Sequence, residues 1–484
     1  MNYEALLAGR LTRPVRAALI GAGEFGYSLI ARARVLRTLE VPVVCDRDVV
    51  RACEALARAG VPQEQFVIAN SRRQALATIE RGAVAVVADG LMATELPVDI
   101  VVEATGDPES GARIGAAAID AGKHVAMVSK ETDSTVGPIL AARARAAGVI
   151  WTPVDGDQPS LLMGLVSWAR TLGLAIVAAG KSSEYDFVFD RATGEVTSER
   201  RRTVAPGLAA LWDIPPGRAA EIVARRAEAV AAIPQRTVPD YCEMTVVSNA
   251  TGLVSDTPGF HAPVARTIEV PELFRPQSEG GLLAQNGIID VFNCLRRPDE
   301  ASFAGGVFVV VCFDDKTVEN LLRGKGIPTS RDGTHALLYN PSHLLGVEAP
   351  LSLLLAVGLG HASCGENPRP VSDLVAITAR PFKAGEHLVL GERHAIEGFT
   401  PRMQAADLAK FARALPYYMA AGRRIARDLP AGAPVTYDAI EAPEDSMLWR
   451  LRAEQDARPE FAAKGAPVAR GKMTCGWADS RPVR

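Results

Sequence analysis

The sequence predicts an α/β fold in which a doubly wound parallel sheet comes first and a central α+β domain follows. Aliphatic and β-branched runs alternate with helical patterns from residue 15 to residue 153, which is typical of parallel strands joined by helices. A glycine-rich turn follows directly on the first of these runs. The 484 residues are enough for several domains with separate cores.

The first strand is expected over Val15 to Ile20, and the next six residues have the pattern G-x-G-x-x-G. A helix over 27–39 and a strand over 41–45 follow. The first glycine permits a tight turn, the second lets the backbone approach a pyrophosphate, and the third lets helix and strand pack closely. Free N–H groups at the helix start attract phosphate. We therefore predict a Rossmann dinucleotide-binding domain with cofactor contacts at Gly21, Gly23, Glu24, Phe25 and Gly26.

The end of the second strand bears on the choice of nicotinamide cofactor. Asp46 lies about 20 positions beyond Gly26, where an acidic residue accepts hydrogen bonds from the adenosine ribose. A carboxylate there favours NAD because it repels a 2′-phosphate, whereas the neighbouring Arg47 can pair with that phosphate. We expect both residues in the cofactor site, with NADP and NAD as open alternatives.

The sheet is expected to continue with strands over 84–87, 100–104, 125–128 and 149–153 and with helices over 111–121 and 138–147. Open parallel sheets bind ligands at the carboxyl ends of their strands. Thr105 and Gly106 follow one such strand and are predicted to contact the cofactor. Lys130 follows another, where a cation orients a substrate or stabilises an oxyanion. The alternative is a surface lysine at a strand exit.

Four polar residues in the middle of the chain are further candidates. Asp155 and Asp157 can hold a divalent cation such as Mg²⁺ or Mn²⁺, or one of them can cap the helix that follows. Lys181 comes after a strand expected over 174–178 and is a candidate general acid or anchor, with a solvated loop lysine as the alternative. His343 is a candidate proton carrier or phosphate contact, or else a structural histidine.

Composition narrows the class of protein. The formal net charge of −3 gives no basic excess for nucleic acid. Seven cysteines without a C-x-x-C pair argue against a disulfide framework or structural zinc site and favour a reducing cytoplasm. The first residues lack an apolar signal core. The apolar stretch 351–360 is too short to span a bilayer, so we expect a buried helix there and no membrane partner.

Several stretches resemble known families. The G-A-G-E-F-G turn, V-E-A-T-G-D-P and G-K-H-V-A-M-V-S-K-E resemble the homoserine dehydrogenase and sugar-oxidoreductase type of Rossmann domain. L-Y-N-P-S-H-L-L-G-V-E-A-P-L resembles a hallmark of a narrower group, and residues 379–390 and 426–440 resemble the paired repeats of a SAF (β-clip) domain. The order of these modules resembles the deoxyxylulose 5-phosphate reductoisomerase-like oxidoreductases.

The resemblance implies a Rossmann domain over 1–155, a central catalytic and dimerisation domain over 156–370, a SAF-like domain over 371–442 and a tail over 443–484. It also implies NADPH-dependent conversion of 1-deoxy-D-xylulose 5-phosphate to 2-C-methyl-D-erythritol 4-phosphate, an isoprenoid precursor. Asp155 and Asp157 would then be the metal ligands, and Lys130 and Lys181 would face the nicotinamide. A sugar phosphate substrate and a homo-oligomer, dimer or tetramer, complete these expectations.

The sequence differs from the reductoisomerase-like family at two places, and two other functions are open. The metal loop reads Asp155-Gly156-Asp157 where the family has an Asp-Ser-Glu type, and Asn340-Pro341-Ser342 replaces a more basic segment before His343. One alternative is a homoserine dehydrogenase-like enzyme or a sugar, polyol or hydroxy-acid dehydrogenase. The other is a non-catalytic regulatory protein that binds a nicotinamide cofactor.

Overall fold

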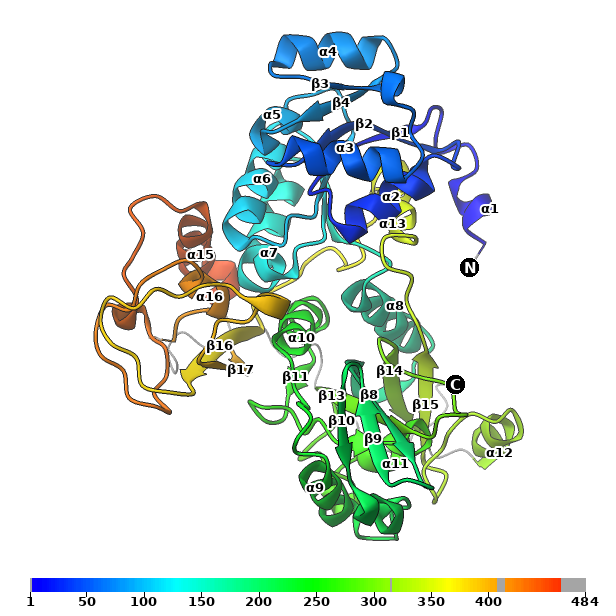
Figure 1. Cartoon of the computed structure of the whole chain (residues 1–484). Helices are drawn as coiled ribbons and strands as arrows, with labels where there is room; N and C mark the ends of the chain where they lie inside the picture. Colours follow the sequence, from blue (N-terminus) through cyan, green and yellow to red (C-terminus); the bar gives the residue numbers. More distant parts are fainter. Residues whose placement is uncertain (1, 314–315, 407–413, 463–484) are drawn as a thin grey trace, which may run out of the picture. The chain divides into compact units, whose positions relative to one another are not determined.

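The computed structural model describes residues 2–313, 316–406 and 414–462, which fall into two compact units (Figure 1). Among these residues, unit 1 comprises 2–160, 344–400, 406 and 414–462. Unit 2 comprises 161–313, 316–343 and 401–405. Chain segments far apart in sequence therefore build each unit.

Unit 1 contains a seven-stranded sheet in the order β3-β4-β2-β1-β5-β6-β7, and every neighbouring pair is parallel. The strands are β1 (Val15–Ile20), β2 (Leu39–Cys45), β3 (Phe66–Ile68), β4 (Val84–Val87), β5 (Ile100–Glu103), β6 (His124–Met127) and β7 (Trp151–Pro153). The buried, aliphatic sequences of these strands suit a sheet that is covered on both faces. The predicted α/β class with a parallel N-terminal sheet is confirmed.

Two groups of helices pack on this sheet. The first group is α2 (Glu24–Ala33), α3 (Val49–Arg58) and α13 (Ala349–Leu359), and the second is α5 (Gly90–Thr94), α6 (Pro108–Asp120) and α7 (Lys130–Ala146). The short α1 (Tyr3–Leu7) lies against α13, and α4 (Arg72–Glu80) lies against β3 and β4. The stretch expected to form a buried helix is α13, which packs on the sheet although it comes two hundred residues later than β7.

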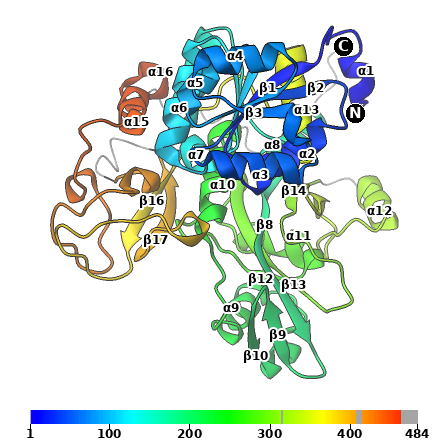
Figure 2. The same ribbon diagram turned by 45° about the horizontal axis from the view of Figure 1, so that its top comes forward.

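The C-terminal segments of unit 1 are mostly irregular. β16 (Ser372–Thr378) pairs with β17 (Phe399–Ala405), of which only the first two residues belong to unit 1, and isolated bridges join Phe382 to Leu429 and Ile377 to Pro434. The two repeat-like stretches therefore lie side by side, while the assignment of 371–442 to a SAF domain stays a prediction. α15 (Met447–Ala457) packs against α6 and α7, and α16 (Pro459–Ala462) follows it (Figure 2). The rest of the predicted tail lies outside the described residues.

Unit 2 is built on a mixed sheet. Its strands are β8 (Ala175–Asp190), β9 (Glu195–Ser198), β10 (Arg201–Val204), β11 (Val254–Ser255), β12 (Val264–Ala265), β13 (Ile288–Arg296), β14 (Val307–Cys312) and β15 (His335–Asn340). The helices are α8 (Gln158–Thr171, which begins in unit 1), α9 (Ala219–Ala229), α10 (Val238–Thr251), α11 (Val270–Leu273) and α12 (Lys316–Gly324). β8 lies between β13, which is parallel to it, and β14, which is antiparallel.

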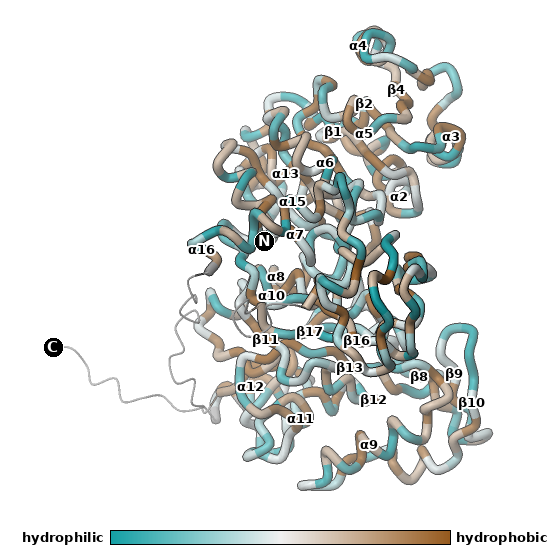
Figure 3. Tube along the Cα trace, turned by 90° about the vertical axis from the view of Figure 1, so that its left-hand side faces the viewer, coloured by the Kyte–Doolittle hydropathy of each residue, from teal (hydrophilic) through white to brown (hydrophobic). Residues whose placement is uncertain are grey.

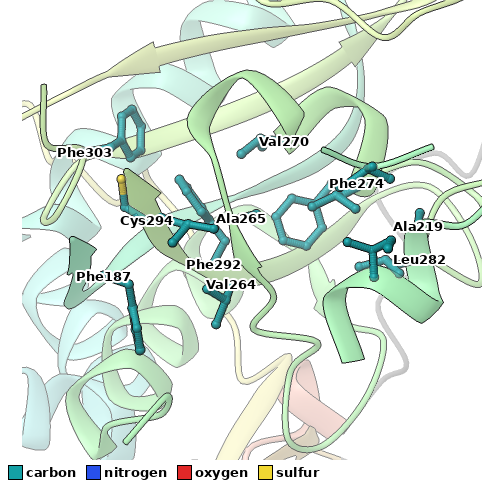
Figure 4. Packing of buried hydrophobic residues seen from close by; sticks show 14 of the residues in the cluster. Phe187, Ala219, Val264, Ala265, Val270, Phe274, Leu282, Phe292, Cys294 and Phe303 are labelled. Carbon is teal, nitrogen blue, oxygen red and sulfur yellow. The ribbon is translucent and has the colours of Figure 1, made fainter. Parts of the chain in front are cut away.

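Hydrophobic residues run through the strands of both units, whereas α4 carries many hydrophilic ones (Figure 3). Arg72, Arg73 and Gln74 of that helix are exposed. In unit 2, aromatic rings form much of the core (Figure 4). Phe292 of β13 contacts Phe303 and Phe308 there, with ring centroids 5.4 and 5.6 Å apart. In the described part of the chain, no helix is long and apolar enough to cross a membrane.

Two element predictions were wrong in a way that moves candidate residues. α7 begins at Lys130, not near residue 138, so Lys130 stands at the start of a helix. β8 continues to Asp190 instead of ending near residue 178, so Lys181 lies inside a strand and not in a loop. Pairing with β13 and β14 carries this strand through Gly180-Lys181-Ser182-Ser183, a stretch with the composition of a turn.

Candidate functional site

The glycine turn after β1 has the geometry that dinucleotide binding needs. Gly21 has φ +104°, and a Cβ there would lie 2.3 Å from the Ala104 carbonyl oxygen. A Cβ on Gly26 would lie 2.4 Å from the carbonyl oxygen of Gly21. Both clashes are with backbone, so neither position accepts a larger residue without moving the turn. At Gly23 a Cβ would meet only the guanidinium of Arg51, at 3.2 Å, so the missing side chain leaves open space there.

Helix α2 presents its first turn at this place. Its N-cap, Gly23, makes no side-chain capping bond, and so the N–H groups of that turn have no side-chain acceptor from the cap. Phe25 is buried in the core of unit 1, where it anchors the helix. Glu24 is exposed and pairs with Arg58 at 2.9 Å. The arrangement suits a pyrophosphate at the helix N-terminus.

Asp46 connects the turn to the end of β2. Its Oδ2 accepts a hydrogen bond from the N–H of Ala22 at 2.9 Å, and its Oδ1 accepts one from the N–H of Asp48 at 3.0 Å. Arg47 follows Asp46 in the chain, and Arg51 reaches Gly23; both are exposed, neither makes an ion pair with a described residue, and the charge of Arg51 acts on Glu24. Both carboxylate oxygens thus already have protein donors, while the two guanidinium groups are free for an anion.

The strand order decides which half of a dinucleotide lies where. The connections run to one side of β1 through β2 and β4, and to the other side through β5, β6 and β7. The crevice at such a reversal is the binding place in doubly wound sheets. With the adenosine half beside Asp46, the nicotinamide half faces the carboxyl ends of β5 and β6. Thr105, Gly106 and Lys130 are on that side.

The loop after β5 is held by buried polar groups. Oε1 of the fully buried Glu103 accepts hydrogen bonds from the N–H and the hydroxyl of Thr105. Burial raises the pKa of Glu103 to about 7, although hydrogen bonds from Ser129 and Thr105 work in the other direction. The N–H of Gly106 donates to the Ser129 hydroxyl at 2.8 Å. Thr105 and Gly106 are therefore fixed in place before any ligand binds.

Asp155 and Asp157, the two predicted metal ligands, each form hydrogen bonds or ion pairs with other protein groups. Lys130 Nζ lies 3.1 Å from Asp157 Oδ2, and Asp157 Oδ1 also accepts the N–H of Gln158. Asp155 accepts hydrogen bonds from the hydroxyls of Ser160 and Ser352, at 2.5 and 2.9 Å. The described residues include no group of three or more His, Cys, Asp or Glu side chains suited to a metal ion. Among the described residues these carboxylates are held by Lys130 and by serine hydroxyls, and a divalent cation at Asp155 and Asp157 stays a prediction.

A histidine from the C-terminal part of unit 1 completes this region. His394 Nδ1 lies 3.1 Å from Oε1 of Glu131, the neighbour of Lys130, and its ring packs against Gly106. Burial raises the pKa of Glu131, and the charges of His394 and Lys130 oppose that shift. Arg393 and His394 both have left-handed backbones, with φ of +53° and +56°. Such strain gathers at functional loops. Sequence reasoning missed His394, and no pattern around it indicates the contact.

Lys181 lies in the other unit and is fully buried. Its ammonium group pairs with two carboxylates of α10, Glu243 and, at 3.1 Å, Asp240. Burial alone would lower the pKa of Lys181, but the charges of Glu243 and Asp240 outweigh it and raise the pKa above its ordinary value. Asp240 also accepts the Ser183 hydroxyl at 2.7 Å and closes the capping box at the start of α10.

His343 is also in unit 2, in the loop after β15. Its Nδ1 donates to the carbonyl oxygen of Gly305 at 2.9 Å, and the side chain is half-buried. This contact ties the loop to the turn that precedes β14. The structure does not bring His343 into contact with Lys181 or with another predicted site residue of unit 2.

Unit 2 holds a second ionisable cluster that sequence reasoning missed. His261 Nδ1 lies 2.7 Å from Oδ2 of Asp290, a fully buried residue of β13. Asp290 faces Gly180 across the β8–β13 pair, one position from Lys181. A charged residue inside the apolar run I-I-D-V-F was the available signal, because such residues are rarely buried without a purpose.

Comparison with known proteins gives one family match for each of the two units. Residues 22–152 match the family "Homoserine dehydrogenase, NAD binding domain", and residues 236–349 match "Oxidoreductase DRL, catalytic domain". Two 1-deoxy-D-xylulose 5-phosphate reductoisomerases, from Anaeromyxobacter dehalogenans and Anaeromyxobacter sp., are each 31% identical over 164 residues. That stretch is 34% of this chain and 37% of each relative, so the match covers little more than a third of their length.

Two solved structures show more distant similarity. A probable dehydrogenase from Thermotoga maritima is 12% identical over 72% of this chain and 90% of its own, with a TM-score of 0.37. The WlbA dehydrogenase from Bordetella pertussis, in complex with NADH and UDP-GlcNAcA, is 17% identical over 36% and 47%, with a TM-score of 0.27. TM-scores this low carry no argument about activity.

The family matches settle the class of the protein. One is to a nicotinamide-binding domain and the other to an oxidoreductase catalytic domain. They confirm the expectation of an NAD(P)-dependent oxidoreductase and the resemblance to the reductoisomerase-like and homoserine dehydrogenase-type families.

Proposed function

We propose that the protein transfers a hydride between NADP and a carbonyl or hydroxyl carbon of a small polar molecule. The observation that carries this proposal is the turn at Gly21, Gly23 and Gly26, where added side chains would strike backbone or fill the space before helix α2. The catalytic-domain match over 236–349 supplies the second half of such an enzyme. Bound NADP supplies or accepts the hydride.

The preference for NADP rests on the charges at the end of β2. Asp46 has both oxygens committed to backbone N–H groups, so it is poorly placed to select the free ribose hydroxyls of NAD. Arg47 and Arg51 lie beside it without carboxylate partners among the described residues. A guanidinium pair is a good receptor for a 2′-phosphate.

The first substrate to test is 1-deoxy-D-xylulose 5-phosphate. Its conversion to 2-C-methyl-D-erythritol 4-phosphate consumes one NADPH and one proton per molecule. The two reductoisomerase relatives and the catalytic-domain match support this choice. Lys130, on the nicotinamide side of the sheet, is the residue of unit 1 that we propose orients the substrate, with Asp157 holding its ammonium group in place.

A second candidate is a dehydrogenase that does not rearrange the carbon skeleton and acts on homoserine, a polyol or a hydroxy acid. The pairing of Asp157 with Lys130 and of Asp155 with two serines favours it. In this arrangement, the carboxylates serve to position neighbouring side chains and helix α8. The substrate would then be polarised by protein donors.

The experiment is a binding titration followed by turnover. Affinities for NADPH and NADH are measured by calorimetry on the full chain. Oxidation of NADPH is then followed with deoxyxylulose phosphate, with and without Mg²⁺ or Mn²⁺. Reduction of NADP⁺ is followed with homoserine and with a panel of polyols and hydroxy acids. Turnover of deoxyxylulose phosphate supports the first candidate, and turnover of a panel alcohol supports the second. Tight binding of NADPH without turnover of any of them would favour the regulatory alternative.

Oligomeric state and location stay predictions. A homo-oligomer is expected, and light scattering on the purified chain tests it. A cytoplasmic location is expected from cysteine usage.

A further inference from the structure

The loop 256–262 of unit 2 is held in a strained conformation around one histidine. The residues on both sides of His261 have left-handed backbones, with φ +54° at Phe260 and +45° at Ala262. Neither is glycine, and the left-handed region is unfavourable for a residue that carries a Cβ. The surrounding structure must therefore impose this conformation, and it presents His261 in a fixed place.

Hydrogen bonds to the carbonyl groups of this loop hold it in the strained conformation. Arg236 donates to the carbonyl oxygens of Gly259, Phe260 and His261, at 2.7, 3.2 and 3.1 Å. Asn293 donates to the carbonyl oxygen of Ala262 at 3.0 Å. A chain of four consecutive carbonyl groups is thus bound by two side chains from other elements, so the loop is rigid before a substrate arrives.

Asp290 fixes the tautomer of the imidazole. Its carboxylate is 2.7 Å from His261 Nδ1 and also accepts the backbone N–H groups of His261, Ala262 and Val291. With those N–H donors around it, the carboxylate is an acceptor for the proton on Nδ1. A histidine whose Nδ1–H is held in this way exchanges its second proton at Nε2.

Nε2 is the atom of His261 that is left for a ligand. It makes no hydrogen bond with a described residue, and its nearest carboxylate oxygen is Oδ2 of Asp256, at 3.5 Å. The side chain is 17% exposed. Burial and the charge of Arg236 lower the pKa of His261. The hydrogen bond and charge of Asp290, together with the charge of Asp256, outweigh them, so the pKa is raised.

Two further side chains contact the loop. Tyr241 of α10 stacks on Phe260 and donates its hydroxyl to Gly259. Arg402 of β17 lies against Gly259. Lys181 follows Gly180 in β8, so its side chain and its two carboxylate partners on α10 lie on the opposite face of the sheet from Asp290. The groups around His261 therefore come from α10, β13, Arg402 and the loop itself, in the unit that contains most of the catalytic-domain match.

We propose that His261 is the acid–base residue of the reaction, with Asp290 as its positioning residue and Asp256 as the carboxylate beside its Nε2. The proposal rests on the function proposed above. In reduction, the Nε2–H bond breaks and its proton forms an O–H bond on the substrate carbonyl oxygen, while the carbonyl carbon takes the hydride, with its two electrons, from NADPH, which becomes NADP⁺. The imidazole becomes neutral and regains a proton from solvent. Oxidation reverses each step.

The test compares His261→Asn, His261→Ala and Asp256→Asn with the wild type, using the substrate that turns over best. Asparagine keeps a donor for Asp290, so His261→Asn is the conservative change. We expect kcat to fall about 100-fold to 10,000-fold in both His261 variants. Added imidazole should restore part of the rate of His261→Ala. The affinity for NADPH, bound by unit 1, should change less than twofold.

Two pH measurements separate a catalytic role from a structural one. Reduction by the wild type should slow as pH rises through the pKa of His261, and His261→Asn should lose this limb. Labelled-histidine NMR should give the same midpoint for the His261 ring, and Asp256→Asn should move both midpoints to lower pH, because it removes a negative charge beside Nε2.

The outcomes distinguish this inference from the proposed function. A wild type that turns over no substrate overturns both. A wild type that is active while His261→Asn keeps its rate and its pH limb overturns the inference alone. If neither His261 variant folds, Asp256→Asn decides, and unchanged midpoints in rate and NMR titration refute the proposal.

Discussion

Replacing Lys181 with methionine removes the cation from a fully buried cluster. The methionine fills a similar volume, but the two carboxylates of Asp240 and Glu243 then remain in the core without it. Loss of one partner from a buried ion pair costs about 3–5 kcal/mol. For a unit of this size, about 2–4 °C of melting temperature accompany each kcal/mol, so the shift should be on the order of 10 °C.

The pH dependence of this loss has a definite sign. The pKa of Lys181 is raised in the folded protein, so its stabilisation is fully present below the ordinary lysine pKa and is lost only in strongly alkaline solution. The difference between wild type and Lys181→Met should therefore persist from pH 6 to pH 9. Below that range it should narrow, because an unpaired carboxylate in the core takes up a proton.

The assay is thermal unfolding followed by circular dichroism, with two controls. Lys325 is exposed in the same unit, and Lys325→Met should change stability by about 0.5 kcal/mol or less. The double variant Lys181→Met/Glu243→Gln should recover part of the loss, since it removes one of the two charges. A melting temperature for Lys181→Met within about 1 °C of the wild type would show that the buried ion pairs of Lys181 do not stabilise unit 2.

Three further changes have expected outcomes. Replacing both Arg47 and Arg51 with alanine should raise the Kd for NADPH about tenfold or more and leave that for NADH nearly unchanged; equal losses in calorimetry would contradict the proposed phosphate site. Burial raises the pKa of Asp133 to about 7, so the folded wild type loses stability as pH rises from the ordinary aspartate pKa toward that value. Asp133→Asn removes this loss, and its advantage in melting temperature over the wild type should therefore grow as pH rises from 5 to 8. A difference in melting temperature that does not change with pH would show that Asp133 is not the cause. Arg452→Ala should cost unit 1 about 3–5 kcal/mol in urea unfolding, since it leaves Asp373, held at 2.6 and 2.8 Å, unpaired; an unchanged midpoint speaks against it.

Local signals carried most of what the sequence predicted in unit 1. The turn from Gly21 to Gly26 and strands such as β4, at residues 84–87, depend on neighbours in the chain, and they lie where the pattern put them. The end of β8 is not set by residues adjacent in the chain. Gly180 and Ser182 have the composition of a turn, yet pairing with β13 and β14 extends the strand past them.

The candidate site could be predicted only where its residues follow a strand. Lys130 was found by that rule, but its partner, Asp157, was assigned to a cation because two carboxylates in a loop are also a ligand pattern. His261 and Asp290 are brought together by the packing of a strained loop on β13, and spacing in the sequence carries no information about that contact. The same holds for His394 and its contact with unit 1.

The direct test of the account is NADPH binding by the wild type and by Gly26→Ala, measured by calorimetry. A Cβ at position 26 would press on the carbonyl oxygen of Gly21, 2.4 Å away, whereas Gly164→Ala in α8 meets nothing within 4 Å and serves as the control. We predict saturable binding by the wild type and by Gly164→Ala, and an affinity at least tenfold weaker for Gly26→Ala. Equal binding by all three proteins, or no binding of either nicotinamide cofactor by the wild type, would contradict a dinucleotide site at the turn from Gly21 to Gly26.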